Sequence, residues 1–524
     1  MNTNDVVSSS PSTGARRSPG VVKNGVINYG GQAVSMVALI LLVPYMIRHL
    51  GQDGYGIWAL VGTFIAQGSL FDLGFASAIT KYVAEYESRG ELAECRGLVS
   101  AAASFYLLLS LVVVAVGFLL APHFPRWFSV PPEMAVEAQQ LVILSSLSFA
   151  VAMFGSSVFA ALEGLQRFDI VSTLGVVRVL LFSFGVFAVL QMGFGLVAVA
   201  LCQIGSRLVV LVPALWSLDR LAPELRFART PPDPRKIGQV VSFSWALFLA
   251  RLGGHIQTQV DEIVVGAKLA IGAVTPYAVA LRLAEIPQRL AQQYLRLLMP
   301  LASSVHSTAG EDDRLRSIFV TSTRLTVGIV FGAGLLLSML APQILTLWIG
   351  EEFRIYAGLV AVLVLALGLD LVQWPAGEIL QGINRHRIFA VTALVTGGLN
   401  LGLSLLFVER FGLIGVAWGT AIPAALELGF VIWPFAIRTL GLPTARLLRD
   451  GLLPGLIAAI PSALVAALVL YSIPDAKVLF ELLAAATLGG STFVAVYLAM
   501  PPSMPERALL KTAVDSLAGR RPDA

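Results

Sequence analysis

The strongest constraint on this chain is the recurrence of apolar stretches of 18 or more residues, separated by short loops that are charged or rich in proline and glycine. An α-helix of that length crosses the hydrocarbon core of a bilayer. Only 13% of the 524 residues are charged, whereas a soluble domain carries about 25%. Lipid is therefore the expected solvent for most of the chain, which excludes a water-soluble protein of this size.

The pattern predicts an all-α integral membrane protein with about fourteen transmembrane helices. The expected spans are 21–49, 55–80, 98–121, 136–161, 169–190, 195–217, 238–267, 273–301, 317–341, 356–380, 388–408, 412–436, 451–471 and 479–500. Residues 1–19 are rich in serine, proline and small polar residues, so we expect a disordered cytosolic tail there. Residues 503–524 are expected to form a second cytosolic tail.

The distribution of positive charge tests this count. With fourteen spans, the loops on the side of the N-terminus hold 23 lysines and arginines and the loops on the opposite side hold 6. Cytoplasmic loops of membrane proteins carry such an excess. The bias supports a multi-pass protein with both termini in the cytoplasm. The outer loops, the longest near 121–135 and 342–355, are too short to hold a catalytic domain.

An internal repeat divides the chain into two lobes. Residues 162–167 (LEGLQR) match 380–385 (LQGINR), 194–200 match 411–417, and 50–60 match 271–281 more weakly. The offset corresponds to six helices, an even number, so the two copies have the same orientation in the membrane. We expect lobes at 20–220 and 238–440, a cytoplasmic linker at 221–237, and two additional helices within 441–502.

Polar residues within the eighth span form a stripe. They recur at spacings of three, four and seven, which places them on an arc of about 100° of a helix. The stripe consists of Arg282, Glu285, Arg289, Gln292, Gln293 and Arg296. It is expected to face a watery cavity or the other lobe, because such residues are too costly to expose to lipid. Pro287 is expected to kink this helix.

The seventh span carries a similar set, and the first two spans carry a milder one. The residues are Arg251, His255, Asp261 and Glu262 in the seventh span, Asn28 in the first and Asp72 in the second. One hypothesis is structural: Arg251–Glu262 and Arg282–Glu285 are ion pairs that hold the lobes together. The other is a cationic cavity, because four arginines of the seventh and eighth spans face three carboxylates. Guanidinium groups suit phosphate oxygens, so an anion with phosphate or pyrophosphate is the simplest substrate.

Four of these residues are candidates for coupling transport to an ion. His255 titrates near neutral pH in its unperturbed state, and Asp72, Asp261 and Glu262 are alternative proton or sodium sites. The sequence contains no Walker A motif, H-E-x-x-H motif, nucleophile elbow or Cys/His metal spacing. We therefore expect no cofactor, no metal site, no enzymatic activity and no nucleic-acid partner.

One stretch resembles a known family. Asn28-Tyr-Gly-Gly, then residues 50–60 (LGQDGYGIWAL) and 72–80 (DLGFASAIT), are similar to the N-terminal signature of the bacterial polysaccharide transporter family. That family includes Wzx-type O-antigen flippases, within the superfamily that also holds multidrug extruders and the lipid II flippase. The resemblance implies a bacterial inner-membrane carrier that moves an undecaprenyl-pyrophosphate-linked oligosaccharide to the periplasmic leaflet by alternating access. It also implies a polysaccharide polymerase and chain-length proteins as candidate partners.

Two alternatives remain at this stage. A multidrug/cation antiporter of the same superfamily typically has twelve helices and an acidic site. A membrane polysaccharide polymerase or ligase needs a large periplasmic loop, which is absent from this sequence. The glycan carried, the coupling ion and the oligomeric state are not specified by the sequence.

Overall fold

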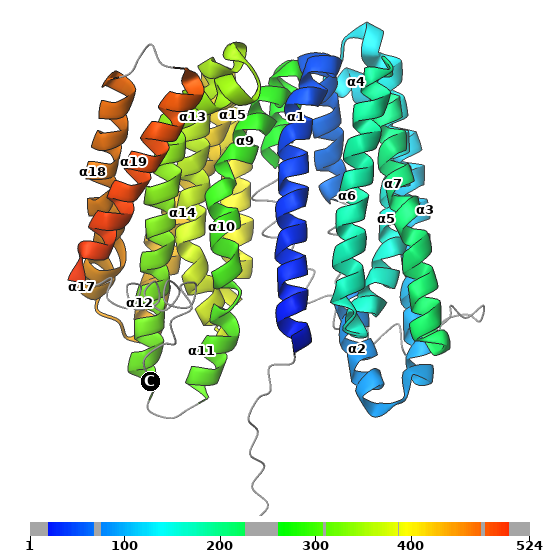
Figure 1. The fold of residues 1–524 in the computed structure, drawn as a ribbon, viewed down its shortest axis with the longest axis horizontal. Helices are drawn as coiled ribbons and strands as arrows, with labels where there is room; N and C mark the ends of the chain where they lie inside the picture. The colour runs from blue at the N-terminus through cyan, green and yellow to red at the C-terminus, as the bar shows by residue number, and fades with distance from the viewer. Residues whose placement is uncertain are drawn as a thin grey trace, which may run out of the picture.

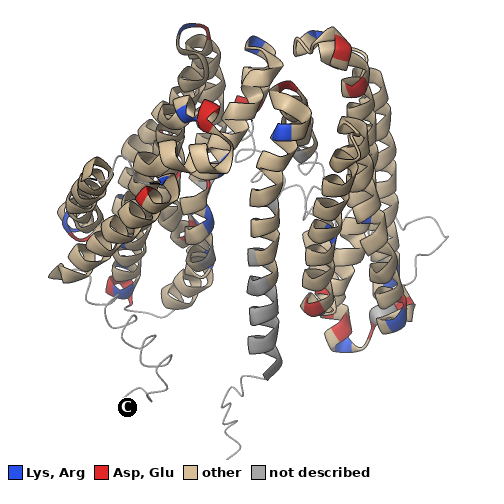
Figure 2. Ribbon diagram, turned by 45° about the horizontal axis from the view of Figure 1, so that its top comes forward, with Lys and Arg blue, Asp and Glu red and all other residues tan. Residues whose placement is uncertain are grey.

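The computed structural model describes residues 19–67, 75–225, 260–307, 311–385, 387–472 and 477–501. All regular secondary structure within these ranges is helical. Nine helices of the described chain are long and apolar enough to cross a membrane. Lysine, arginine, aspartate and glutamate gather mostly at the two ends of the helices, with long uncharged stretches between them (Figure 2). The prediction of an all-α membrane protein is confirmed.

The N-terminal lobe contains five of the described long helices and the shorter α2. They are α1 (Pro19–Gln67), α2 (Phe75–Arg89), α3 (Leu92–Leu120), α5 (Ala135–Gly164), α6 (Phe168–Gln191) and α7 (Leu196–Leu221). Short helices α4 (Phe124–Trp127), η2 (Pro132–Met134) and η3 (Pro223–Leu225) connect or follow them. Gly51 in α1 has a non-helical backbone (φ 71°, ψ 176°), so α1 comprises the first predicted span and the start of the second. Figure 1 shows the chain reversing there.

The C-terminal lobe begins, in the described chain, with the helical residues 260–268. It continues through η4 (Ile271–Ala273), α9 (Val274–Ala284), α10 (Ile286–Leu295), α11 (Leu298–His306), α12 (Asp312–Ile329), η5 (Val330–Gly334), α13 (Leu335–Trp348), η6 (Glu351–Tyr356), α14 (Ala357–Gly382), α15 (Arg387–Leu426), η7 (Glu427–Ile432) and α16 (Trp433–Leu440). Gly412 (φ 58°) divides α15 as Gly51 divides α1. The last elements, α17 (Thr444–Arg446), η8 (Leu447–Leu452), α18 (Leu453–Ser472) and α19 (Val478–Ala499), lie beside this lobe (Figure 1).

Two predicted spans differ from the observed helices in instructive ways. The second was predicted to end at residue 80, but α2 continues to Arg89, where Arg89 and Glu85 form an ion pair (2.6 Å) one turn apart. Such pairs prolong a helix in water, beyond the point where hydropathy marks the membrane boundary. The eighth is divided into α9, α10 and α11, and α10 starts with Pro287 in its first turn. Proline lacks the N–H that a continuous helix uses, so the expected kink is observed there.

The sequence repeat corresponds to a repeated turn. Both α5 and α14 end in a left-handed residue, Gln166 (φ 56°) and Asn384 (φ 59°). In each turn the next N–H bonds to the carbonyl five residues back, from Arg167 to Leu162 (2.9 Å) and from Arg385 to Leu380 (2.7 Å). These bonds define a Schellman cap. The same cap at the same register in both lobes confirms that they are structural repeats.

A glycine in each cap makes the same close helix contact. A Cβ on Gly164 would lie 2.6 Å from Val83 Cβ of α2, and one on Gly382 would lie 2.7 Å from the carbonyl oxygen of Met299 in α11. No larger residue fits between these backbones without moving a helix. Helix pairs α2–α5 and α11–α14 are therefore equivalent parts of the two lobes.

Large apolar side chains cover much of the outer surface. Leu108 of α3, Phe184 of α6, Val212 of α7 and Leu464 of α18 are more than 60% exposed. Soluble proteins rarely display apolar surface on this scale, whereas lipid solvates it. Hydrocarbon chains are therefore the natural neighbours of these faces.

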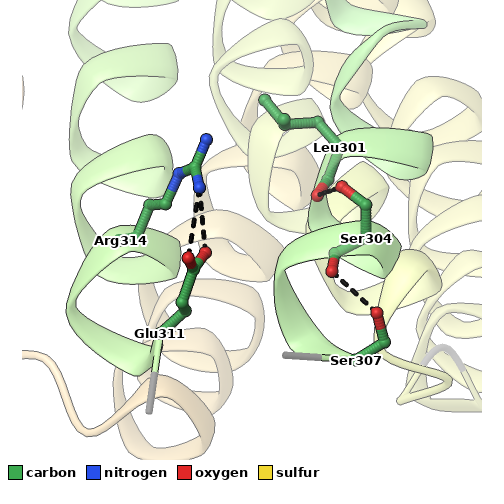
Figure 3. A network of polar contacts seen from close by, with 5 residues as sticks. All are labelled: Leu301, Ser304, Ser307, Glu311 and Arg314. Atoms are coloured by element: carbon green, nitrogen blue, oxygen red, sulfur yellow. Dashed lines mark hydrogen bonds and ion pairs between the residues drawn. The ribbon is translucent and has the colours of Figure 1, made fainter. Parts of the chain in front are cut away.

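The end of α11 and the start of α12 show how polar groups at the helix ends find partners. Ser304 and Ser307 donate hydrogen bonds to the carbonyls of Leu301 (2.8 Å) and Ser304 (2.7 Å), and Arg314 bonds to both carboxylate oxygens of Glu311 (3.3 and 3.0 Å) (Figure 3). In each of these bonds, the donor and the acceptor lie three residues apart at the end of one helix. Polar groups at this end are thus satisfied locally, and none of these bonds joins the two helices.

Candidate binding cavity between the lobes

A cavity of about 300 Å³ lies between the two lobes. The second half of α1 forms one wall, and residues 260–268, α9 and α10 form the other. Its lining consists of Trp58, Ala59, Gly62, Thr63, Asp261, Glu262, Ala278, Leu281, Arg282, Glu285 and Arg289. Both walls are thus made by the second, seventh and eighth predicted spans.

Five of the predicted site residues line this cavity: Asp261, Glu262, Arg282, Glu285 and Arg289. Of the stripe in the eighth span, only the N-terminal half, Arg282, Glu285 and Arg289, lines the cavity. Gln292 and Arg296 lie further along α10 and at its C-terminal end, outside the cavity lining.

The other predicted site residues are described incompletely or not at all. Arg251, His255 and Asp72 lie outside the described residues. Asn28 and Gln293 belong to α1 and α10, but their side chains are not described.

Charge in the described lining differs from the predicted excess of cations. Two arginines face three carboxylates there, because Arg296 lies elsewhere and Arg251 is not described. Arg289 forms an ion pair with Glu285 (2.7 Å) and still exposes 59% of its side chain. Arg282 interacts with Tyr55, Glu262 and Glu285. The arginines therefore stand in a mixed network in which Arg289 remains the most accessible cation.

Hydrogen bonds join the two lobes beside the cavity and across it. Thr275 donates a hydrogen bond to the carbonyl of Gln52 (2.5 Å), and Trp348 donates one to the carbonyl of Ile40 (2.7 Å). Thr63 of α1 donates to the carboxylate of Glu262 in the opposite wall. Figure 1 shows α1 beside α9 near the top of the molecule. The two lobes are therefore held together beside and across the cavity by direct contacts.

Asp261, which lines the cavity, also belongs to a second polar network that was not predicted. It is buried (6% exposed), and one carboxylate oxygen accepts hydrogen bonds from Tyr277 (2.7 Å) and Thr420 (2.6 Å). Asn400 donates to Thr420 (3.2 Å), and Ser404 donates to Asn400 (3.1 Å). The other oxygen of Asp261 has no hydrogen-bond partner among the described residues. Asn400 and Ser404, one turn apart in an apolar span, were the sequence signal for this network.

A third buried polar group lies deeper in the C-terminal lobe. Asp370 of α14 accepts hydrogen bonds from Gln288 (3.2 Å), Gln373 (2.9 Å) and Trp374 (3.1 Å). Gln373 also approaches Glu427 of η7 (3.5 Å). This network joins α10 to α14 and η7, so it connects the helix that carries part of the stripe to the interior of its own lobe.

Comparison with known proteins agrees with this architecture. Residues 21–306, more than half of the chain, match the family described as polysaccharide biosynthesis protein. Agl15 of Haloferax volcanii, named as a probable low-salt glycan biosynthesis flippase, is 21% identical over 386 residues, covering 74% of this chain and 77% of Agl15.

Two solved structures share the fold. The lipid II flippase MurJ in an inward closed conformation superposes with a TM-score of 0.72 at 13% identity, covering 93% of this chain and all of MurJ. A multidrug resistance MATE family transporter in an inward-facing conformation superposes with a TM-score of 0.66 at 15% identity, covering 78% and 94% of the two chains. At these identities the likeness concerns the fold alone.

Proposed function

The chain belongs to the polysaccharide biosynthesis protein family, and on that premise we propose that it is a flippase for lipid-linked glycans. Its substrate is an undecaprenyl-pyrophosphate-linked oligosaccharide, which it moves from the cytoplasmic to the periplasmic leaflet of the bacterial inner membrane by alternating access. Both termini lie in the cytoplasm, as the distribution of loop charge indicates.

The observation that carries the proposal is the pair Arg282 and Arg289 in a polar cavity between the two lobes. Planar guanidinium groups bind phosphate oxygens through paired hydrogen bonds. Arg289 is the better placed of the two for the pyrophosphate, since most of its side chain is accessible. The polyprenyl tail stays in the bilayer, where its burial costs nothing, and only the charged and sugar groups enter the cavity.

Charge in the described lining also favours a second candidate, a cation antiporter. Asp261, Glu262 and Glu285 outnumber the two arginines there, and an organic cation binds carboxylates. Each carboxylate nevertheless has a partner within the protein: Tyr277 and Thr420, Thr63, and Arg289 respectively. An organic cation competes with Thr63 and Arg289 for Glu262 and Glu285, and the remaining oxygen of Asp261 is buried, whereas an anion needs only to share the exposed part of Arg289.

Asp261 is the best-placed residue for ion coupling. It is buried, it has one carboxylate oxygen without a described partner, and it bonds to Thr420 of α15. A bound proton or sodium ion changes these bonds directly, so it alters how residues 260–268 pack against α15. Because Glu262 is the next residue in the chain, ion binding at Asp261 also affects the cavity wall at Glu262.

The test is transbilayer movement of a fluorescent polyprenyl-pyrophosphate oligosaccharide in proteoliposomes. Arg289→Gln and Arg282→Gln are compared with Arg314→Gln, an exposed arginine outside the cavity. We expect both cavity variants to slow movement at least tenfold, because each removes a charge-assisted contact worth about 1.5–3 kcal/mol. Running the assay with a sodium or proton gradient, with and without Asp261→Asn, identifies the coupling ion.

Two results would contradict the proposal. Efflux of organic cations without movement of any anionic glycolipid would favour the antiporter. Movement that is equally slow in Arg314→Gln would show that the loss reflects overall charge and not the cavity.

A further inference from the structure

A larger cavity, of about 560 Å³, lies away from the lobe interface at the inner end of the C-terminal lobe. Its walls come from α12, from α17, η8 and the start of α18, and from the end of α19. It therefore lies where the two additional helices meet the lobe, and the proposed transport cycle assigns no role to it.

Positive charge dominates this cavity. Among the described residues, its lining contains Arg324, Arg446 and Arg449 together with a single carboxylate, Asp450. Arg324 is buried (3% exposed), and its guanidinium donates a hydrogen bond to the backbone carbonyl of Asp450 (3.3 Å). Arg449 lies 4.0 Å from the Asp450 carboxylate and is 85% exposed. The formal charge of the lining is thus two units positive, with the accessible charge at its mouth.

The other part of the lining is apolar and continuous with the lipid-facing surface. Leu453 and Ile457 of α18 line the cavity and are 44% and 47% exposed. Further along the same helix, Ile460 and Leu464 are 63% and 65% exposed. Guanidinium groups at one end and an exposed apolar helix face beside them match the headgroup and the acyl chains of a phospholipid.

We propose that this cavity binds the phosphate headgroup of an anionic phospholipid of the inner leaflet. Arg446 and Arg449 contact the phosphate oxygens, and buried Arg324 supplies a fixed positive charge at the base. The acyl chains lie along Leu453 and Ile457. A free phosphate ion makes the same contacts with the arginines but has no acyl chains to lie along Leu453 and Ile457, so the lipid is the better occupant.

Such a lipid would join parts of the chain that are distant in sequence. The cavity walls belong to α12 on one side and to α18 and α19 on the other. Its headgroup therefore ties the two additional helices to the lobe, and the site does not depend on which substrate the central cavity carries.

The experiment measures lipid binding to the purified full-length protein in detergent by native mass spectrometry. The probe is phosphatidylglycerol, with zwitterionic phosphatidylcholine and inorganic phosphate as separate arms. The double variant Arg446→Gln/Arg449→Gln removes the accessible charge and leaves Arg324 in place. The matched control Arg385→Gln/Arg438→Gln removes two exposed arginines of the inner side that are outside the cavity lining.

We expect the cavity variant to bind phosphatidylglycerol about 25-fold more weakly, since each of the two arginines near an anionic headgroup contributes about fivefold. The control should bind like the wild type. Equal loss in both double variants, or no loss in either, would overturn the proposal. Binding of phosphatidylcholine as tight as that of phosphatidylglycerol would also overturn it, and displacement of the lipid by millimolar inorganic phosphate would assign the cavity to a free anion instead.

Discussion

The contact that closes the cavity on the outer side depends on Gly56. A Cβ at this position would lie 2.4 Å from the carbonyl oxygen of Ile271 and 3.2 Å from its carbon. An ordinary C···O contact is about 3.3 Å, so Gly56→Ala forces the two backbones apart by about 1 Å. No rotamer change relieves a clash between a methyl group and a backbone carbonyl. Overpacking of this kind costs about 1–3 kcal/mol.

That cost applies only while the outer ends are in contact. In the state with separated outer ends, the added methyl group faces open space. The substitution should therefore shift the equilibrium between the two states by about 5- to 150-fold towards outer opening.

Labelling from the outer face can measure this shift. Gly62→Cys places a thiol in the cavity lining, at a position where an added Cβ meets no atom within 4 Å. The two native cysteines, Cys95 and Cys202, are first replaced by alanine. A membrane-impermeant maleimide added to right-side-out vesicles then reports outer opening, and Gly56→Ala should raise the labelling rate by the factor above.

The control is Gly205→Ala in α7, where an added Cβ also meets no atom within 4 Å. It should leave the labelling rate unchanged. A rate in Gly56→Ala equal to that of the background protein would refute the assignment of this contact as the outer closure.

Two predictions concern stability, measured by thermal unfolding in detergent. Gly382→Ala should lower Tm, because its Cβ would lie 2.7 Å from the carbonyl oxygen of Met299, whereas Gly398→Ala, with open space around it, should not. Gln166→Gly should raise the free energy of unfolding by about 1 kcal/mol, since it relieves a left-handed backbone at a non-glycine residue. Asn384→Gly should gain less, because asparagine tolerates that conformation. A loss of stability in Gln166→Gly would contradict this account.

The membrane-spanning helices were predictable because a single physical requirement determines them. Backbone groups in hydrocarbon must bond within the helix, and apolar side chains must cover about 30 Å. Every predicted span within the described residues is helical. The ends were less accurate, as α2 shows, since a helix continues in water after hydropathy has fallen.

The site was only partly predictable, for a different reason. Periodicity places Arg282, Glu285 and Arg289 on one face of one helix, and that inference uses neighbouring residues alone. The Asp261 network needs Tyr277, Thr420 and Asn400, which lie on other helices. No periodic signal connects residues on different helices, whether they are 16 positions apart, as Asp261 and Tyr277 are, or 159, as Asp261 and Thr420 are. The predicted surplus of arginine stays a prediction, because the described lining holds two of the four arginines and Arg251 lies outside the described residues.

The family-like stretch at 50–60 now has a physical explanation in one helix. Gly56 allows the closest approach to Ile271, Trp58 lines the cavity, and Thr63, one turn further along, bonds across the cavity to Glu262. Closure of the outer side and binding in the cavity therefore depend on the same rigid segment of α1. A ligand that draws Arg282 away from Glu262 changes the charge beside the Thr63 bond, and so it acts on a contact between the lobes. Binding energy in the cavity can in this way alter the outer closure without any intermediate element.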